Sequence, residues 1–208
     1  MVRRHPLPLR LPDQWLFSDD RLTIGMAELA ALLPPGSGIV LRQGMLAKAA
    51  RWRMLRRLIR VARRRGLTIF LAGRPDLARR WGADGVHLRQ HDAARAVQAR
   101  RLGLIVTMPV HDAREARQAG RAGVDGVFIS PLYPTRSHPD APTLGMTTWM
   151  RLARLAGTQA IALGGMTATR ARKLSRASGK QAGWAAIDAW EEKATKRRTR
   201  QKRKAVPT

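Results

Sequence analysis

Short apolar runs alternate with longer segments of helical periodicity along almost the whole chain. The runs are rich in Val, Ile, Leu and Ala and do not alternate strictly with polar residues, which is typical of strands buried on both faces. Eight such runs are present, at residues 15–19, 38–43, 67–73, 85–89, 104–110, 124–130, 159–165 and 182–188. Each is followed by a segment that can form a helix, so the pattern predicts eight strand–helix units.

Glycine marks the end of several predicted helices. Gly66, Gly103, Gly123 and Gly157 stand just before a run, where a left-handed glycine commonly closes a helix. Eight units in about 190 residues predict an α/β protein with a compact (β/α)8 (TIM) barrel, near the lower end of that fold's size. Because residues 74–84 leave little room for a crossover, a doubly wound open sheet is the alternative.

The pattern also predicts domain boundaries. We expect one barrel over residues 14–192, preceded by a proline-rich N-terminal extension over 1–13 and followed by a disordered basic tail over 193–208. No apolar run approaches the roughly 20 residues that a membrane span needs, and the N-terminus lacks the apolar stretch of a signal peptide. The chain has no Cys, which excludes disulfides and thiolate sites. We therefore expect a soluble cytoplasmic protein without a membrane partner.

The charge of the chain is strongly positive, with 40 Lys and Arg against 14 Asp and Glu and a formal net charge of +26. Clustered Lys and Arg give salt-dependent affinity for nucleic-acid phosphates without any special fold. Much of the charge, however, lies on the polar face of residues 47–66 and in the tail, and no aromatic-rich basic strand accompanies it. This distribution favours a solvated face and tail over a dedicated RNA-binding surface, with non-specific nucleic-acid binding by the tail as the alternative.

In a barrel, chemistry belongs on the loops that follow the strands. The loop after the sixth run offers the hydrogen-bond donors Thr135, Arg136, Ser137 and His138. The loop after the seventh run carries Gly164 and Gly165 in "GGMT", where backbone N–H groups at a helix start can bind a phosphate. A tight turn with Thr167 as the helix cap is the simpler interpretation of the same residues.

Other runs end near side chains that suit acid–base or anion chemistry. Arg42 stands alone in an apolar context and is placed to bind an anion at the barrel mouth. His111 could move protons near neutral pH, although an exposed histidine at a helix start is the simpler interpretation. His87 lies within a run and is expected to be packed or hydrogen-bonded inside the barrel.

Two carboxylates have a structural and a chemical interpretation. Asp92 could ligate Mg²⁺, which favours a few carboxylates with phosphate oxygens and water, or it could cap the helix that follows. Asp188 and Glu191 have the spacing of a capping box, and we favour that role for them.

Taken in order, the motifs resemble a known enzyme family. The segments "WLFSDDR", "LRQ", "GADGVHLRQHD", "GVDGVFISPLYPT", "TLG" and "AIALGGMT" resemble the thiamine phosphate synthase family, including its thiazole tautomerase branch, across residues 14–190. The synthase branch couples a hydroxymethylpyrimidine diphosphate to a thiazole phosphate, with Mg²⁺ and release of pyrophosphate. The resemblance implies a barrel that acts in thiamine biosynthesis, with these two phosphorylated small molecules as its partners.

The resemblance also implies roles for the candidate residues. Arg42 would contact the diphosphate and Asp92 would ligate Mg²⁺. Thr135 and Ser137 would bind at the thiazole end, and Gly165 would supply phosphate-binding backbone. With His138 and Gly164 from the same two loops, they make up the predicted substrate-binding residues.

The chain is a divergent member, because several positions of the family pattern are altered. Gln43 and Gly44 follow Arg42 where the family has an acid and a lysine, and Ala72 and Gly73 replace Asn-Asp. Other substitutions put Pro109 in place of a serine, His138 in place of a lysine, and Asp188 in place of a serine, where its charge would repel a phosphate. These changes affect the diphosphate and metal end most.

The tautomerase branch transfers a proton on a thiazole phosphate without a diphosphate or a metal. In that branch the histidine aligned with His111 does the work, and a glycine is tolerated where Gly73 stands. A synthase with altered site residues is therefore our first hypothesis, and a tautomerase that uses His111 is the second. The third is a non-catalytic barrel that binds a phosphorylated ligand or RNA.

Overall fold

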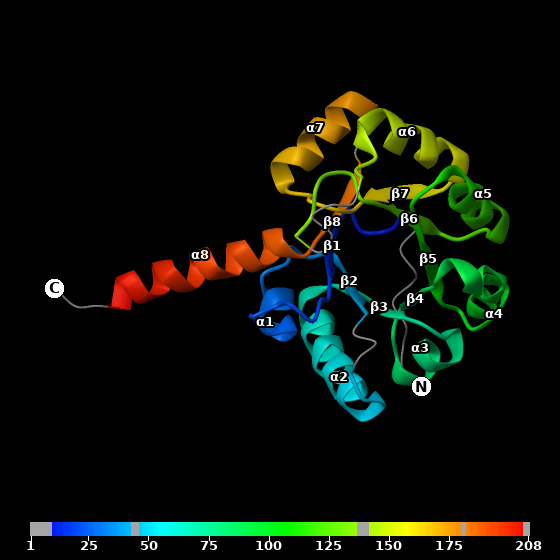
Figure 1. Ribbon diagram of the computed structural model, residues 1–208. Helices are drawn as coiled ribbons and strands as arrows, with labels where there is room; N and C mark the ends of the chain where they lie inside the picture. The colour runs from blue at the N-terminus through cyan, green and yellow to red at the C-terminus, as the bar shows by residue number, and fades with distance from the viewer. Residues whose placement is uncertain (1–9, 43–45, 137–141, 180–181, 206–208) are drawn as a thin grey trace.

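The computed structural model is a closed barrel of eight parallel strands with helices around it (Figure 1). It describes residues 10–42, 46–136, 142–179 and 182–205. Each strand pairs with its neighbours along the chain, and β1 closes the ring by pairing with β8. The strands are β1 (Gln14–Phe17), β2 (Gly38–Leu41), β3 (Thr68–Ala72), β4 (Gly85–His87), β5 (Ile105–Val110), β6 (Gly126–Ile129), β7 (Gln159–Ala162) and β8 (Gly183–Ala186). The predicted (β/α)8 barrel is confirmed, and the open sheet does not form.

The helices cover the outside of the barrel. They are α1 (Met26–Ala31), α2 (Lys48–Arg65), α3 (Pro75–Trp81), the 3₁₀ helix η1 (Gln90–Arg95), α4 (Ala96–Arg101), α5 (Ala113–Ala122), α6 (Gly145–Ala156), α7 (Ala168–Ser178) and α8 (Asp188–Ala205). Left-handed Gly66, Gly123 and Gly157 end α2, α5 and α6 as predicted, whereas Gly103 follows the cap residue of α4. The short segment 74–84 forms a crossover because Pro75 starts α3 and Gly82 ends it after seven residues.

Aromatic side chains fill the inside of the barrel opposite glycines. The ring centroid of Trp15 lies 5.0 Å from that of Phe70 and 5.2 Å from that of Phe128, edge to face in both pairs. A Cβ atom at Gly38 would lie 2.2 Å from the Trp15 ring, and one at Gly85 would lie 2.4 Å from the Phe70 ring. Large residues on β1 and β3 therefore require glycine at the starts of β2 and β4.

Residues just before β1 close the barrel at the amino ends of the strands. Leu11 is buried among the aromatic side chains, and its backbone N–H and C=O each bond the side-chain amide of Gln159 at 3.0 Å. The indole Nε1 of Trp15 donates to the carbonyl of Pro12 at 2.6 Å. The barrel was expected to start at residue 14, but residues 11 and 12 already pack against it.

His87 lies inside the barrel, as predicted. Its Nδ1 lies 3.1 Å from Thr107 Oγ1, and its ring contacts Phe17 and Phe128 edge to face. Burial, aided by the positive charges of Arg42 and His111, lowers the pKa of His87 to about 3. The imidazole is therefore a neutral core group at physiological pH.

The last helix is longer than the sequence suggested. Residues 193–205, expected as a disordered tail, continue α8, which projects away from the barrel (Figure 1). Its base is anchored by Trp190, whose Nε1 donates to the carbonyl of Trp15 at 3.0 Å and whose ring stacks on Trp184 at 5.3 Å. The helix continues because Lys, Arg and Gln are good helix formers and neither Pro nor Gly interrupts it.

Within the described part of the chain, no helix is both long and apolar enough to cross a membrane.

Candidate active site at the carboxyl ends of the strands

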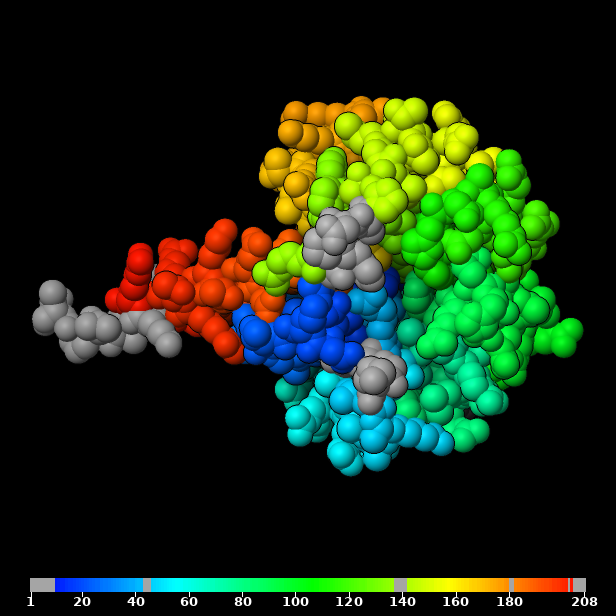
Figure 2. Space-filling model, viewed as in Figure 1, coloured from blue at the N-terminus to red at the C-terminus, as the bar shows by residue number. Residues whose placement is uncertain are grey.

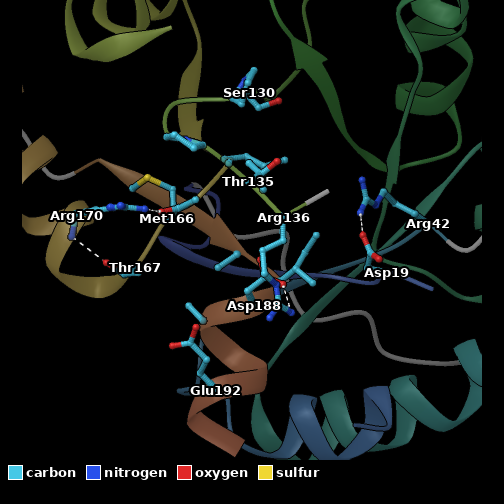
Figure 3. A pocket seen from close by; sticks show the side chains of 18 of the residues that line it. Asp19, Arg42, Ser130, Thr135, Arg136, Met166, Thr167, Arg170, Asp188 and Glu192 are labelled. Atoms are coloured by element: carbon cyan, nitrogen blue, oxygen red, sulfur yellow. Dashed lines mark hydrogen bonds and ion pairs between the residues drawn. The ribbon is translucent and has the colours of Figure 1, made fainter. Parts of the chain in front are cut away.

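A cavity of about 540 Å³ opens at the end of the barrel where the strands terminate. Its lining comes from the loops after β1, β2, β5, β6, β7 and β8 and from the starts of α7 and α8. Figure 3 shows Arg42 and Asp19 on one side, Thr167 and Arg170 on the other, and Arg136 and Asp188 between them. This volume is within the usual range for sites that hold small molecules.

Five of the predicted site residues line this cavity, namely Arg42, His111, Thr135, Gly164 and Gly165. Two more, Ser137 and His138, lie outside the described residues. Asp92 does not line the cavity. The tertiary structure therefore brings together candidates from four different loops.

Arg42 is held at the mouth by residues that follow β1. Its Nε donates to the carbonyl of Ser18 at 3.1 Å, and its Nη2 donates to Asp19 Oδ2 at 3.2 Å. Burial lowers the pKa of the Arg42 guanidinium, and the charge of Asp19 opposes this effect. An anionic ligand that binds Arg42 must compete with the carboxylate of Asp19.

Asp19 is itself shared between two arginines. Besides Arg42, it accepts hydrogen bonds from Arg21 Nε at 2.9 Å and from the Arg21 backbone N–H at 3.0 Å. Burial alone would raise the pKa of Asp19, but the hydrogen bonds and charge of Arg21 and the charge of Arg42 hold it below its usual value. Asp19 was not singled out from the sequence, because its partners become apparent only in the fold.

His111 is oriented by the helix that follows it. Its Nδ1 and its backbone N–H both contact Glu115 Oε2, at 2.8 and 2.7 Å. A carboxylate can only accept, so Nδ1 carries a proton, and Nε2 is the nitrogen that can accept one when the ring is neutral. Asp112 caps α5 by accepting from the Glu115 N–H at 2.8 Å, which fixes the first turn. His111 can therefore act as a base at the cavity wall.

The turn after β7 fits both interpretations of the "GGMT" motif. Gly164 and Gly165 have φ values of +93° and +59°, and Cβ atoms there would lie 2.7 Å from Pro131 Cα and 2.5 Å from Pro134 O. Thr167 Oγ1 accepts from the Arg170 N–H at 3.2 Å and caps α7, as expected. Because this turn and the start of α7 also line the cavity, their backbone N–H groups are placed for an anion.

Arg170 is a cavity residue that was missed in the sequence. Its Nη1 donates to the carbonyl of Gly165, and its guanidinium lies 4.5 Å from the centroid of the Tyr133 ring. A positive side chain in the first turn of a helix opposes the helix dipole. An arginine at this position of the sequence therefore indicates that its side chain binds a group outside the helix.

The capping box expected for Asp188 and Glu191 is replaced by contacts to other loops. Asp188 Oδ1 accepts from Arg136 Nη2 at 3.1 Å. Glu191 Oε1 accepts from the N–H and the hydroxyl of Thr23, both at 2.7 Å. The expectation was wrong because partners distant in the chain reach these carboxylates once the barrel closes.

Asp92 lies in η1 and is engaged by its neighbours. Arg95 Nε donates to Asp92 Oδ1 at 2.8 Å, and His91 Nε2 lies 3.5 Å from Oδ2. No side chain caps η1, so Asp92 does not have the predicted capping role there. Within residues 10–42, 46–136, 142–179 and 182–205, no group of three or more His, Cys, Asp or Glu could hold a metal ion. Mg²⁺ at Asp92 stays a prediction, and it would require Arg95 to release the carboxylate.

The described lining of the cavity is balanced in charge. It includes the arginines Arg42, Arg136 and Arg170 and the acids Asp19, Asp188 and Glu192. This balance contrasts with the net charge of +26 on the chain. The positive charge of the chain thus lies mainly outside the candidate site.

Comparisons of sequence identify relatives with a consistent description. A family model described as thiamine monophosphate synthase matches residues 20–189. A thiamine-phosphate synthase from Thermus thermophilus is 38% identical over 90 residues, which are 43% of this chain and 44% of the relative. One from Roseiflexus castenholzii is 31% identical over 151 residues, 71% of this chain and 66% of the relative. The matches thus span less than two thirds of the length of these relatives.

Solved structures resemble the whole barrel. A thiamine phosphate pyrophosphorylase from Pyrococcus furiosus superposes with a TM-score of 0.71 at 22% identity, over 89% of this chain and 96% of that one. An HpcH/HpaI aldolase from Desulfitobacterium hafniense gives a TM-score of 0.59 at 12% identity, and the superposition covers 95% of this chain and 94% of the aldolase chain. At these identities the likeness concerns the fold alone.

Proposed function

Because the chain belongs to the thiamine monophosphate synthase family, we propose that it is a transferase of thiamine biosynthesis that couples a pyrimidine diphosphate to a thiazole phosphate. One observation carries this proposal. Arg42 lines the cavity on one side, and Thr167 and Arg170 at the start of α7 line it on the other (Figure 3), which would give two phosphorylated groups separate places.

The thiazole phosphate would bind on the side of β7. Backbone N–H groups at the start of α7 and the glycine turn would donate to its oxygens. Thr135, which lines the cavity from the loop after β6, would contact the thiazole portion. Ser137 and His138 belong to the same loop and stay proposed contacts on sequence grounds.

The pyrimidine diphosphate would bind on the side of β1 and β2. In the reaction, the thiazole nitrogen donates an electron pair to the pyrimidine methylene carbon, and the carbon–oxygen bond breaks with its pair leaving on pyrophosphate. Arg42 would stabilise the charge on the leaving group after exchanging Asp19 for a phosphate oxygen. Arg136 would be a second cation for the departing pyrophosphate. Its side chain is more exposed than that of Arg42, so it can stay in contact with the pyrophosphate as this leaves the cavity.

The described residues fit a protein-held magnesium ion poorly. Asp92 is paired with Arg95, and the cavity carboxylates Asp19 and Asp188 are paired with arginines. When bound, Mg²⁺ would neutralise diphosphate oxygens, and Asp92 is the ligand that the sequence predicts.

The proposal is tested with purified protein, both substrates and Mg²⁺. Thiamine phosphate formation is followed by oxidation to the fluorescent thiochrome, with an Arg42→Gln variant as the comparison. We expect product from the unaltered chain and much less from the variant. Absence of product at high protein concentration would refute the synthase assignment.

A thiazole tautomerase is the second candidate function. The contact of His111 Nδ1 with Glu115 favours it, because this contact prepares Nε2 to accept a proton at the cavity wall. Double-bond migration in the thiazole phosphate, followed by NMR without the pyrimidine substrate, separates this activity from the synthase reaction.

A further inference from the structure

The part of α8 beyond Ala194 is a basic helix that leaves the barrel. Residues 193–204 read KATKRRTRQKRK, and no acid occurs after Glu192. Ala194 is the last residue of α8 described as buried, and the described side chains of residues 195–203 are exposed. At about 1.5 Å per residue, this part of α8 is more than 15 Å long. Its described cations, all exposed, are Lys196, Arg197, Arg198, Arg200 and Arg203.

Among the described residues, few interactions with the rest of the chain stabilise this segment. Lys193 and Arg197 are four residues apart, as are Lys196 and Arg200, and like charges at this spacing disfavour a helix. One ion pair, from Arg198 Nε to Glu28 Oε1 at 2.7 Å, joins the described part of the segment to α1. A helix of this kind gains stability when an external polyanion neutralises it.

The composition of the segment argues against an apolar partner. Residues 193–205 contain no Leu, Ile, Val, Met or aromatic side chain. Insertion into a lipid surface requires an apolar helical face, and so does docking into a hydrophobic groove. The segment is therefore expected to recognise its partner through charge, and the partner to be an anion.

A second set of exposed cations lies on α2. Helix α1 packs against both α8 and α2, and α2 exposes Arg53, Arg56, Arg57 and Arg60. Figure 2 shows the orange and red α8 beside the blue segment around α1, with the cyan α2 on the other side of it. On α2 the guanidinium of Arg56 lies 5.5 Å from the centroid of the exposed Trp52 ring, an aromatic group on which a base could stack.

We propose that the exposed part of α8 forms a binding surface for nucleic acid that recognises the phosphate backbone without sequence preference, with α2 on the far side of α1 as a second basic contact. Its exposed cations project from one helix that leaves the barrel, where each can neutralise a phosphate. This surface is separate from the cavity, because the cavity lining reaches only to Glu192 on α8.

Two variants with the same change in charge test the proposal. In the first, Lys196, Arg197, Arg200 and Arg203 of α8 become Gln. In the matched control, Arg101, Arg114, Arg117 and Arg121 of α4 and α5, which are exposed on the other side of the barrel, become Gln (Figure 1). Fluorescence anisotropy with a short labelled DNA duplex gives the affinity at several salt concentrations, and a duplex of scrambled sequence gives the specificity.

We expect the α8 variant to bind the duplex at least about tenfold more weakly than the unaltered chain near physiological salt. The slope of log K against log salt should become less steep by about two to four, since each lost phosphate contact removes about 0.9 from it. The control variant should lose much less affinity. Both variants should melt at the temperature of the unaltered chain, because none of the eight side chains is buried.

Three results would overturn the proposal. The first is no binding of the unaltered chain to either duplex at about 0.1 M salt. The second is an equal loss in both variants, which would mean that net charge alone is responsible. The third is tighter binding to vesicles containing phosphatidylserine than to the duplex at the same salt, because the surface would then serve a membrane.

Discussion

Arg136 Nη2 donates to Asp188 Oδ1 at 3.1 Å and so joins the loop after β6 to the first residue of α8. Both residues line the cavity (Figure 3), and Arg136 also lies 3.6 Å from Glu191 Oε2. Asp188 therefore faces the candidate site, and its charge is compensated by an arginine that would otherwise be available to an anion. The pair lowers the attraction of the cavity for a phosphate in two ways.

The first prediction concerns this pair. In Asp188→Ser, the carboxylate is removed and Arg136 is left with its longer contact to Glu191, so the affinity for thiazole phosphate should rise about tenfold, or about 1.4 kcal/mol. Isothermal titration calorimetry with thiazole phosphate measures the change.

Asp76→Asn is the matched control for Asp188→Ser. It also removes one carboxylate from an Asp–Arg pair, here with Arg74 on α3, where neither residue lines the cavity. The control should leave the affinity unchanged. Unaltered or weaker binding in Asp188→Ser would mean that Asp188 does not oppose the anion.

The second prediction concerns proton transfer by His111. His111→Ala should abolish migration of the thiazole double bond while the affinity for the thiazole phosphate changes little, because the base is lost and the glycine turn remains. In Glu115→Gln, the rate should fall about tenfold or more, since a neutral amide no longer favours the protonated imidazole. A rate unaffected by both substitutions would exclude His111 as the base.

The third prediction concerns the glycine turn. Gly165→Ala places a Cβ atom 2.5 Å from Pro134 O and 2.9 Å from Tyr133 Cβ, at a φ of +59°. We expect a loss of about 3 kcal/mol in the free energy of unfolding, measured with urea, because backbone strain and overpacking add. Gly157→Ala has a similar φ of +63° but no heavy atom within 4 Å, so it should cost only about 1 kcal/mol. Equal losses would show that the close approach is unimportant.

The fourth prediction concerns pH and stability. His87 has a pKa of about 3 in the folded chain against an ordinary value of 6.5, so the unfolded chain binds more protons between these values. The free energy of unfolding should therefore fall as the pH decreases from 6.5, by up to about 1.4 kcal/mol per pH unit from this group. In His87→Asn, which does not titrate, the decline should be less steep.

His91 is the control for the pH experiment, because its side chain is exposed. Urea unfolding of the unaltered chain, His87→Asn and His91→Asn at several pH values gives the three slopes. The slope for His91→Asn should equal that of the unaltered chain. A His87→Asn slope that also equals it would contradict a buried neutral His87.

The sequence predicted the architecture well because barrel formation depends on local and repeated features. Buried strands require continuous apolar runs, and helices that end at a left-handed Gly66 or Gly123 carry their own stop signal. The order of the motifs also identified the family, and position after a strand identified Arg42 and His111 as residues near the cavity.

Charge partners could not be predicted in the same way. Asp188 and Glu191 have capping-box spacing, but Arg136 and Thr23 bind them from distant parts of the chain. The pairing of Asp19 with Arg42 and the contact of Arg170 with Tyr133 were missed for the same reason, because each joins residues on different segments that only the fold brings within reach. Periodicity in the sequence carries no information about that distance.

The sequence by itself determined eight strand–helix units, their order and the polar loops that follow them, because each unit is specified by residues adjacent in the chain. Closure of the barrel decided which of those loops meet, which acids neutralise Arg42 and Arg136, and how far the last helix extends from the wall. These outcomes depend on contacts between segments far apart in the chain, from 23 residues for Arg42 with Asp19 to 175 for Trp190 with Trp15, and such contacts exist only once the chain is folded.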